Sequence, residues 1–275
     1  MDRQAERKLG GIFQKLSPTD LVGAELQDSR LIYSVVGFMP ASDFTDNALL
    51  ISNLAYLLSQ KGLNTCVVDL KVFYPNLYQY FDVKPNKRGG GLIRVLKSDK
   101  ADFRDELIQT RHERLYLLSP SPYDLIEEYF DFEFEHLERV IETLKGMFDI
   151  ILLDIPNIPA LELSVGAMKY CHVGFFTGSE RVDVAGNIMK MLDYVSSIGI
   201  STAKFTSVIL MNLQNLPFDH KVLGDFGLKI AAALPLVKGA AGGVLEGKLY
   251  VKDTTLMNKY FLREMRKLAD LLGSQ

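Results

Sequence analysis

The chain has 275 residues, of which 48% are hydrophobic, and its formal net charge is −3. A chain of this length and composition can bury a large core, and we expect one α/β domain rather than two small ones. Because the charge is slightly negative, the composition gives no general attraction to nucleic acid or to an anionic membrane. No apolar run is long enough to span a membrane, and residues 1–16 are too charged for a secretory signal, so we expect a cytoplasmic protein.

We expect an N-terminal extension over residues 1–30 that contains a short amphipathic helix. Within residues 1–16, apolar side chains fall on one helical face with basic side chains around them. Such a helix is expected to pack on its own domain or on a partner protein. Weak membrane contact, with peripheral localisation, is the alternative, because one short basic helix binds a membrane only marginally.

From residue 31 onward, short apolar runs alternate with helical patterns, which is typical of βαβ units. The runs lack polar alternation, so we expect each strand to be buried on both faces. The pattern predicts one α/β domain over residues 31–275, with a doubly wound, mostly parallel sheet of about seven strands and helices on both faces. The predicted strands are 31–37, 65–70, 115–120, 148–154, 172–178, 205–212 and 229–235.

The first helix after residue 31 has the clearest sequence signals. Thr45 or Asp46 can cap its N-terminus, an apolar stripe follows, and Gly62 is suited to end it. Residues 84–100, which contain three consecutive glycines, are expected to be less regular. Further helices are predicted over about 124–146, 160–170, 181–197 and 253–272.

The cysteines and histidines do not indicate a metal centre. Cys66 and Cys171 both lie in or beside predicted strands, so we expect buried free thiols. The four histidines fall in separate segments, without the spacing that metal ligands show.

Residues 53–70, NLAYLLSQKGLNTCVVDL, resemble a segment of the ParA/MinD family of deviant P-loop ATPases (SIMIBI class). In that family a helix with NLA-like residues and a KG turn lead into a strand that ends in aspartate. The resemblance covers roughly residues 31–273 and implies a P-loop NTPase-like fold. Matching segments follow in the family's order at 73–77, 91–96, 115–120, 148–156, 205–212 and 232–236.

The resemblance places the family's phosphate-binding pattern, KGGxGKTT, on Ser42 to Leu49. The lysine that reaches across a dimer falls on Ser42, and the lysine that cradles the phosphates falls on Asn47. The two hydroxyl positions fall on Ala48 and Leu49. Residues 31–60 contain no Lys or Arg, so no shift of the alignment restores the positive charge.

The residues around this loop are also unsuited to phosphate. A triphosphate is held by backbone N–H groups in glycine-permitted conformations, by a lysine and by a hydroxyl on Mg²⁺. Gly37 opens the stretch, but Phe38 brings a bulky side chain and Pro40 lacks a backbone donor. Asp43 and Asp46 add carboxylates, which repel phosphate.

Three further positions match the family's nucleotide site in part. Asp69 ends a predicted strand as the family's aspartate does, but the second acidic residue of that motif is Lys71 here. Asp154 falls where the family's aspartate orients Mg²⁺ through water, and Asn212 falls where an asparagine reads adenine. The alternative is that these side chains only cap loops at strand ends.

Charged segments near these positions allow two interpretations each. Lys71 and the basic residues of 84–97 are candidates for substitute phosphate contacts, but a solvated surface loop is the favoured interpretation. Residues 124–144 mix acidic and aromatic side chains, which indicates an amphipathic core helix whose acidic face could bind a basic partner.

The leading interpretation is a non-catalytic ParA/MinD-like protein, a pseudo-ATPase that acts as a positioning or scaffold factor and needs no cofactor. The resemblance implies a homodimer, or a heterodimer with a related ATPase, and an unidentified protein partner. The chain resembles in type the CpaE/TadZ proteins of pilus assembly, but without their N-terminal receiver-like domain. The alternative is an atypical ATPase that binds ATP and Mg²⁺ through Asp69 or Asp154 and serves pilus, division or partition machinery. A nucleic-acid-binding partition protein is the least favoured, because the chain is acidic.

Overall fold

The computed structural model describes residues 33–42, 47–98, 102–130, 132–157, 161–181, 183–213, 221–237, 243, 247–253 and 258–273. The extension over residues 1–30 with its predicted helix lies outside the described residues. So do the predicted helix caps Thr45 and Asp46, and the loop carboxylates Asp43 and Asp46.

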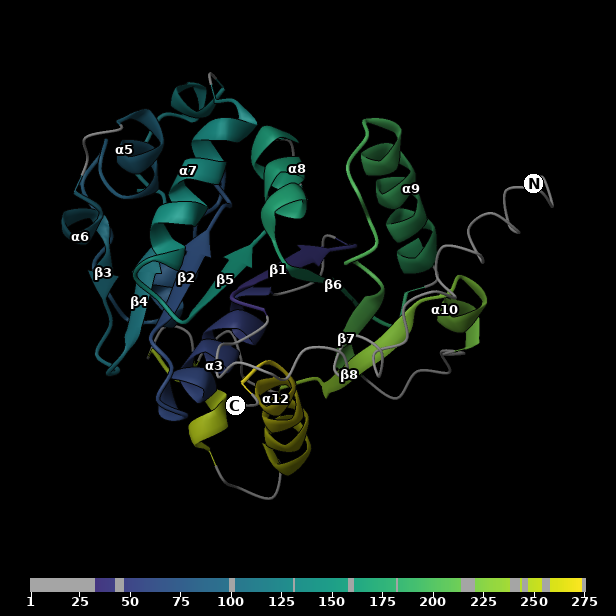
Figure 1. The fold of residues 1–275 in the computed structure, drawn as a ribbon. Helices are drawn as coiled ribbons and strands as arrows, with labels where there is room; N and C mark the ends of the chain where they lie inside the picture. The colour runs from purple at the N-terminus through teal and green to yellow at the C-terminus, as the bar shows by residue number, and fades with distance from the viewer. Residues whose placement is uncertain are drawn as a thin grey trace.

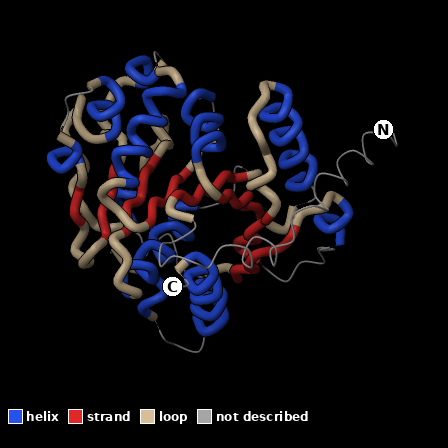
Figure 2. The backbone as a smooth tube through the Cα atoms, in the orientation of Figure 1, coloured by secondary structure: helices blue, strands red, loops and turns tan. Residues whose placement is uncertain are grey.

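One eight-stranded sheet runs through the domain, in the order β3-β4-β2-β5-β1-β6-β7-β8 (Figures 1 and 2). All neighbouring strands pair in parallel except β3, which is antiparallel to β4. The mostly parallel α/β fold is therefore confirmed, with one short edge strand that the sequence did not indicate. The strands are β1 (Val35–Pro40), β2 (Thr65–Asp69), β3 (Ile108–Gln109), β4 (Leu115–Leu118), β5 (Ile150–Asp154), β6 (Val173–Gly178), β7 (Ser207–Leu213) and β8 (Lys229–Pro235).

Helices cover both faces of the sheet: α5, α7, α8 and α9 lie on one face, and α3 and α12 on the other (Figure 1). The 3-10 turns η1 (Ile126–Tyr129) and η2 (Tyr250–Lys252) precede α7 and α12. The α-helices are α3 (Asn47–Gln60), α4 (Leu77–Tyr80), α5 (Leu92–Lys97), α6 (Phe103–Glu106), α7 (Phe134–Lys145), α8 (Leu161–Tyr170), α9 (Asp183–Ser197), α10 (Lys221–Asp225) and α12 (Lys259–Leu272).

The continuous apolar runs are explained by this two-sided covering. In β1, Val35 and Met39 belong to the core beneath α7, α8 and α9, whereas Val36 and Phe38 belong to the core beneath α3 and α12. All residues of β1, β2 and β5 are buried. Burial on both faces removes the alternation of polar and apolar residues that a half-exposed strand would show.

The first strand extends three residues further than predicted, to Pro40. Phe38 is therefore a strand residue in the core rather than a bulky residue of the loop, and Met39 beside it is buried as well. Gly37 lies inside the strand, where a Cβ atom would stand 2.9 Å from Cδ1 of Ile155. Because Gly37 has no side chain, Ile155 and Cys171 can pack closely against the strand.

Several predicted helices are confirmed with different limits. The first helix ends at Gln60, and the following turn contains Gly62 with a positive φ of 91°, as predicted. The predicted helix over 124–146 is wrong as a continuous helix, because Glu133 adopts an extended conformation just before α7, where its backbone N–H donates to His136 Nδ1 at 3.1 Å. Residues 92–97, expected to be irregular, form α5. The predicted helix over 253–272 is confirmed only over Lys259–Leu272.

Candidate functional site

The aspartates at the ends of β2 and β5 meet at the carboxyl edge of the sheet. Asp69 and Asp154 are register partners on these adjacent parallel strands, and both residues are 0% exposed. Two carboxylates buried side by side disfavour each other's ionised form unless cations or N–H donors compensate them. The compensation comes from the loop that follows β2.

Asp69 is compensated by backbone N–H groups. Its Oδ1 atom accepts a hydrogen bond from the N–H of Lys71 at 3.0 Å, and its Oδ2 atom accepts from Asn76 and Leu77 at 3.3 and 3.4 Å. Burial raises the pKa of Asp69, and the Lys71 charge and these backbone bonds oppose that rise. Asp69 therefore caps the loop and the start of α4, as the loop-capping alternative predicted.

Asp154 is compensated by an ammonium group. Lys71 Nζ lies 2.7 Å from Asp154 Oδ2 and donates a hydrogen bond of 3.0 Å to Asn76 Oδ1. Burial raises the pKa of Asp154 to about 6, the Lys71 charge lowers it, and the neighbouring Asp69 raises it. The Asn47 amide adds a smaller stabilisation of the carboxylate without reaching hydrogen-bonding geometry.

The positions aligned with the phosphate lysine and hydroxyls face the interior. Asn47 is the first residue of α3 and is 1% exposed. Its Nδ2 atom donates to the carbonyl of Phe38 at 3.2 Å, and its Oδ1 atom accepts from Thr177 Oγ1. Ala48 and Leu49 are buried in the core on the α3 side of the sheet. These contacts join α3 to β1 and β6 without any positive charge.

The remaining predicted positions are partly described. Gly37 lies within β1, and Ser42, two residues after the strand, is buried. Asn212 belongs to β7, but its side chain lies outside the described structure, so its role as an adenine contact stays a prediction.

Of the candidate basic residues, Lys71 alone is seen to contact the two aspartates within the described structure. Arg88 pairs with Glu128 at 3.7 Å, and Arg94 pairs with Glu106 at 3.0 Å. Both arginine side chains are more than half exposed. These contacts place Arg88 and Arg94 at the surface, but the surface-loop interpretation is wrong for residues 92–97, which form α5 with four buried apolar residues.

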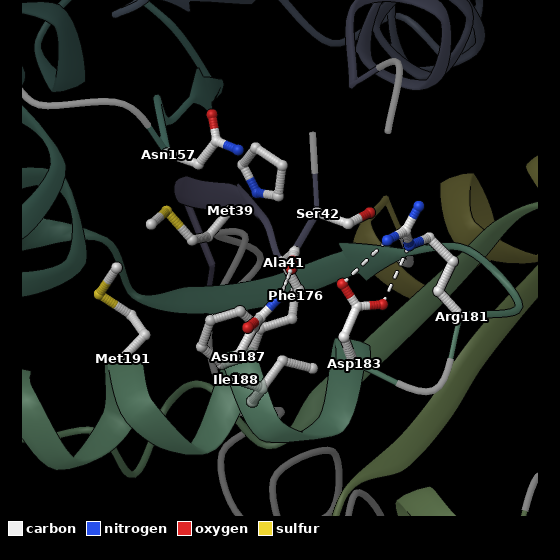
Figure 3. Close-up of a pocket in the computed structure, with 11 residues that line it drawn as sticks. Met39, Ala41, Ser42, Asn157, Phe176, Arg181, Asp183, Asn187, Ile188 and Met191 are labelled. Carbon is white, nitrogen blue, oxygen red and sulfur yellow. Dashed lines mark hydrogen bonds and ion pairs between the residues drawn. The ribbon is translucent and has the colours of Figure 1, made fainter. Parts of the chain in front are cut away.

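A cavity of about 240 Å³ lies beside the end of β1 and the start of α9 (Figure 3). Arg181 is the one basic side chain among its described lining residues, and its Nε atom pairs with Asp183 Oδ1 at 3.0 Å. Asn187 donates from Nδ2 to the carbonyl of Ala41 at 2.9 Å. Met39, Phe176, Ile188 and Met191 supply apolar walls. Because Arg181 is paired with Asp183, the cavity offers little attraction to phosphate. Ser42, the first position of the aligned phosphate-binding pattern, lines it, but the sequence did not indicate the residues from α9.

The described residues do not fit a bound magnesium ion. Asp154 Oδ2 is already paired with the Lys71 ammonium, and the buried Oδ1 atom has no hydrogen-bond partner among the described residues. Within the described ranges, no group of three or more His, Cys, Asp or Glu side chains is arranged to hold a metal. Both cysteines are buried free thiols, as predicted. Among the described helices, none is long and apolar enough to cross a membrane.

No protein-family model and no curated protein sequence matches the chain, but solved structures do. MinD from Pyrococcus horikoshii, complexed with Mg-ADP, is 22% identical, with 86% of this chain and 94% of that chain covered and a TM-score of 0.70. A ParA-family ATPase from Chlorobium tepidum is 18% identical, with 86% and 98% covered and a TM-score of 0.72. Apo McdA from Cyanothece is 14% identical, with 87% and 99% covered and a TM-score of 0.71. The chain therefore has the α/β fold of the MinD and ParA-family ATPases.

Proposed function

We propose that this chain is a MinD/ParA-like positioning or scaffold protein that acts through protein contacts and neither binds nor hydrolyses ATP. The observation that carries the proposal is the ion pair between Lys71 and Asp154 at the carboxyl edge of the sheet. It stands at the strand end where the family's aspartate orients Mg²⁺.

The phosphate side of the site supports the proposal. The position of the phosphate-cradling lysine is held by Asn47, a neutral side chain engaged with Phe38 and Thr177. The two hydroxyl positions, Ala48 and Leu49, are apolar and buried. A hydrogen bond to a charged group contributes about 1.5–3 kcal/mol, and a triphosphate would lose several of them here.

The metal side of the site supports it as well. A divalent cation that approached Asp154 would meet the ammonium of Lys71, which already lies at hydrogen-bonding distance. Repulsion between two unit charges about 4 Å apart is about 4 kcal/mol at an effective dielectric near 20, and a divalent ion doubles it. Nucleotide binding that depends on Mg²⁺ is therefore opposed at two separate points.

The fold supports a role in protein assembly. A MinD protein with this fold, from Aquifex aeolicus, has been solved as a MinC:MinD complex. We propose that this chain likewise works as a homodimer, or as a heterodimer with a related ATPase, together with a further protein partner. The narrower assignment to CpaE/TadZ-type proteins of pilus assembly stays a prediction from the sequence.

Calorimetric titration of the full chain with ATP in the presence of Mg²⁺ tests the proposal. We expect no saturable heat, and the same result with ADP. Binding with micromolar affinity would contradict the proposal. Loss of that binding in Asp154→Ala would then assign it to this edge of the sheet.

The second candidate function is an atypical Mg-ATPase, which the retention of Asp69 and Asp154 as register partners favours. In that case positive charge would come from residues 71–97 or from a partner chain. A turnover assay of the wild type against Asp154→Ala separates the two functions. Hydrolysis that the substitution abolishes would support the ATPase.

A further inference from the structure

A single residue, Lys71, contacts both buried aspartates at the end of the sheet. Its backbone N–H donates to Asp69 Oδ1, and its side-chain Nζ lies 2.7 Å from Asp154 Oδ2. The Lys71 side chain is mostly shielded from solvent, with an exposed fraction of 21%. A partly buried ammonium beside a fully buried carboxylate compensates the charge that a bound cation would otherwise compensate.

The same residue closes the loop that follows β2. Its Nζ atom donates to Asn76 Oδ1, and Asp69 Oδ2 accepts the N–H groups of Asn76 and Leu77. The N–H of Leu70 also donates to the carbonyl of Asp154 at 3.1 Å. Residues 70–77 are thus hydrogen-bonded near both ends to Asp69, the last residue of β2. The ion pair between Lys71 and Asp154 joins them to the end of β5 as well. All these contacts are made by the chain itself.

We propose that Lys71 is a tethered counter-cation that takes the place of a divalent metal beside Asp154 and holds residues 70–77 in one nucleotide-independent state. The inference rests on the proposed function and adds a specific claim about one side chain. Two oxygen atoms, Asp154 Oδ2 and Asn76 Oδ1, now bind the ammonium. Oxygen atoms of carboxylate and amide groups are also the ligands that Mg²⁺ and Mn²⁺ accept. Removal of the ammonium therefore exposes a latent cation site.

The test is Mn²⁺ binding to the full chain at about pH 8, where the freed carboxylate is expected to ionise. Mn²⁺ binding is measured by electron paramagnetic resonance, and its effect on stability by thermal unfolding. Lys71→Met keeps the length of the side chain and removes its charge, whereas Lys71→Arg keeps a charge. Lys87→Met is the matched control, because Lys87 is an exposed lysine of the neighbouring basic segment.

We expect Lys71→Met to show a saturable Mn²⁺ site, at least about tenfold tighter than any residual binding by the wild type, and to gain melting temperature with the metal. The wild type, Lys71→Arg and Lys87→Met should show no saturable site. Equal Mn²⁺ binding by the wild type and Lys71→Met would overturn the inference. So would a folded Lys71→Met variant that binds no metal.

Hydrogen exchange of the wild type keeps the inference testable if Lys71→Met does not fold. The amides of Lys71, Asn76 and Leu77 donate to Asp69, so we expect them to be protected and unchanged by Mn²⁺ or by ATP with Mg²⁺. Rapid exchange at these amides, or protection that appears only with ligand, would overturn it. These readouts are independent of the ATP titration of the wild type, so the failure of this inference and the failure of the proposed function are distinguishable.

Discussion

The Oδ1 atom of Asn47, at the first position of α3, accepts a hydrogen bond from Thr177 Oγ1 in β6. The Nδ2 atom of the same side chain donates to the carbonyl of Phe38 in β1. An amide therefore joins the helix to two strands at the position where the resemblance to ParA/MinD proteins places the phosphate-cradling lysine. In this protein that position contributes to the stability of the fold.

We expect Asn47→Ala to lower the free energy of unfolding by about 1–3 kcal/mol, because it leaves the buried Thr177 hydroxyl and the Phe38 carbonyl without this partner. Urea unfolding of the full chain measures the change. Asn64→Ala is the matched control, because Asn64 is exposed and its recorded hydrogen bonds are made by its backbone. Its effect should stay within about 0.5 kcal/mol. Equal effects of the two substitutions would argue against a structural role for the Asn47 amide.

The raised pKa of Asp154 predicts that the stability of the protein depends on pH. Its pKa in the folded protein is about 6, above its ordinary value of 3.8, so the folded state binds more protons than the unfolded state between these values. The contribution of Asp154 to the free energy of unfolding therefore falls as the pH rises from about 4 to about 6. The substitution Asp154→Asn should remove this pH-dependent contribution to the free energy of unfolding.

Denaturant unfolding at a series of pH values measures that component. The difference in free energy of unfolding between the wild type and Asp154→Asn should decrease across the window and level off above it. A difference that stays constant or grows from pH 4 to pH 6 would contradict a raised pKa for the buried Asp154 carboxylate.

Gly37 and Gly186 form a matched pair for testing close packing. A Cβ atom at Gly37 would lie 2.9 Å from Ile155 Cδ1 and 3.4 Å from Cys171 Sγ, whereas one at Gly186 in α9 meets nothing within 4 Å. We expect Gly37→Ala to destabilise the protein by about 1–3 kcal/mol through overpacking. Gly186→Ala should stabilise it by up to about 1 kcal/mol through helix propensity. Thermal unfolding of both variants is the measurement, and a neutral Gly37→Ala would mean that the core relaxes freely around the added methyl group.

The sheet was predictable from the sequence because its strands are long apolar runs, and β8 was predicted with its observed limits, Lys229–Pro235. The edge strand β3 was missed because it has two residues and is paired only with β4. The short helix α5 was missed because the glycines before it suggested irregular structure, although four of its six residues are buried. Elements this short depend on tertiary packing, which periodicity does not report.

The candidate site was predictable in its positions but not in its contacts. The sequence indicated that Asp69 and Asp154 end strands and that Lys71 replaces an acidic residue. It did not indicate that the Lys71 ammonium reaches Asp154, because that contact depends on the path of residues 70–77 and on the placement of β5 beside β2. Lys71 and Asp154 are far apart in the sequence, and the pairing of β2 with β5 in the sheet brings their side chains together.

The most direct test of the central claim is a crystal structure of the full chain grown with ATP and Mg²⁺. We predict that Lys71 Nζ stays paired with Asp154 and that no nucleotide density lies against Asn47 and Ala48. Density for a nucleotide seated at these residues, with Lys71 displaced from Asp154 by a metal ion, would contradict the account.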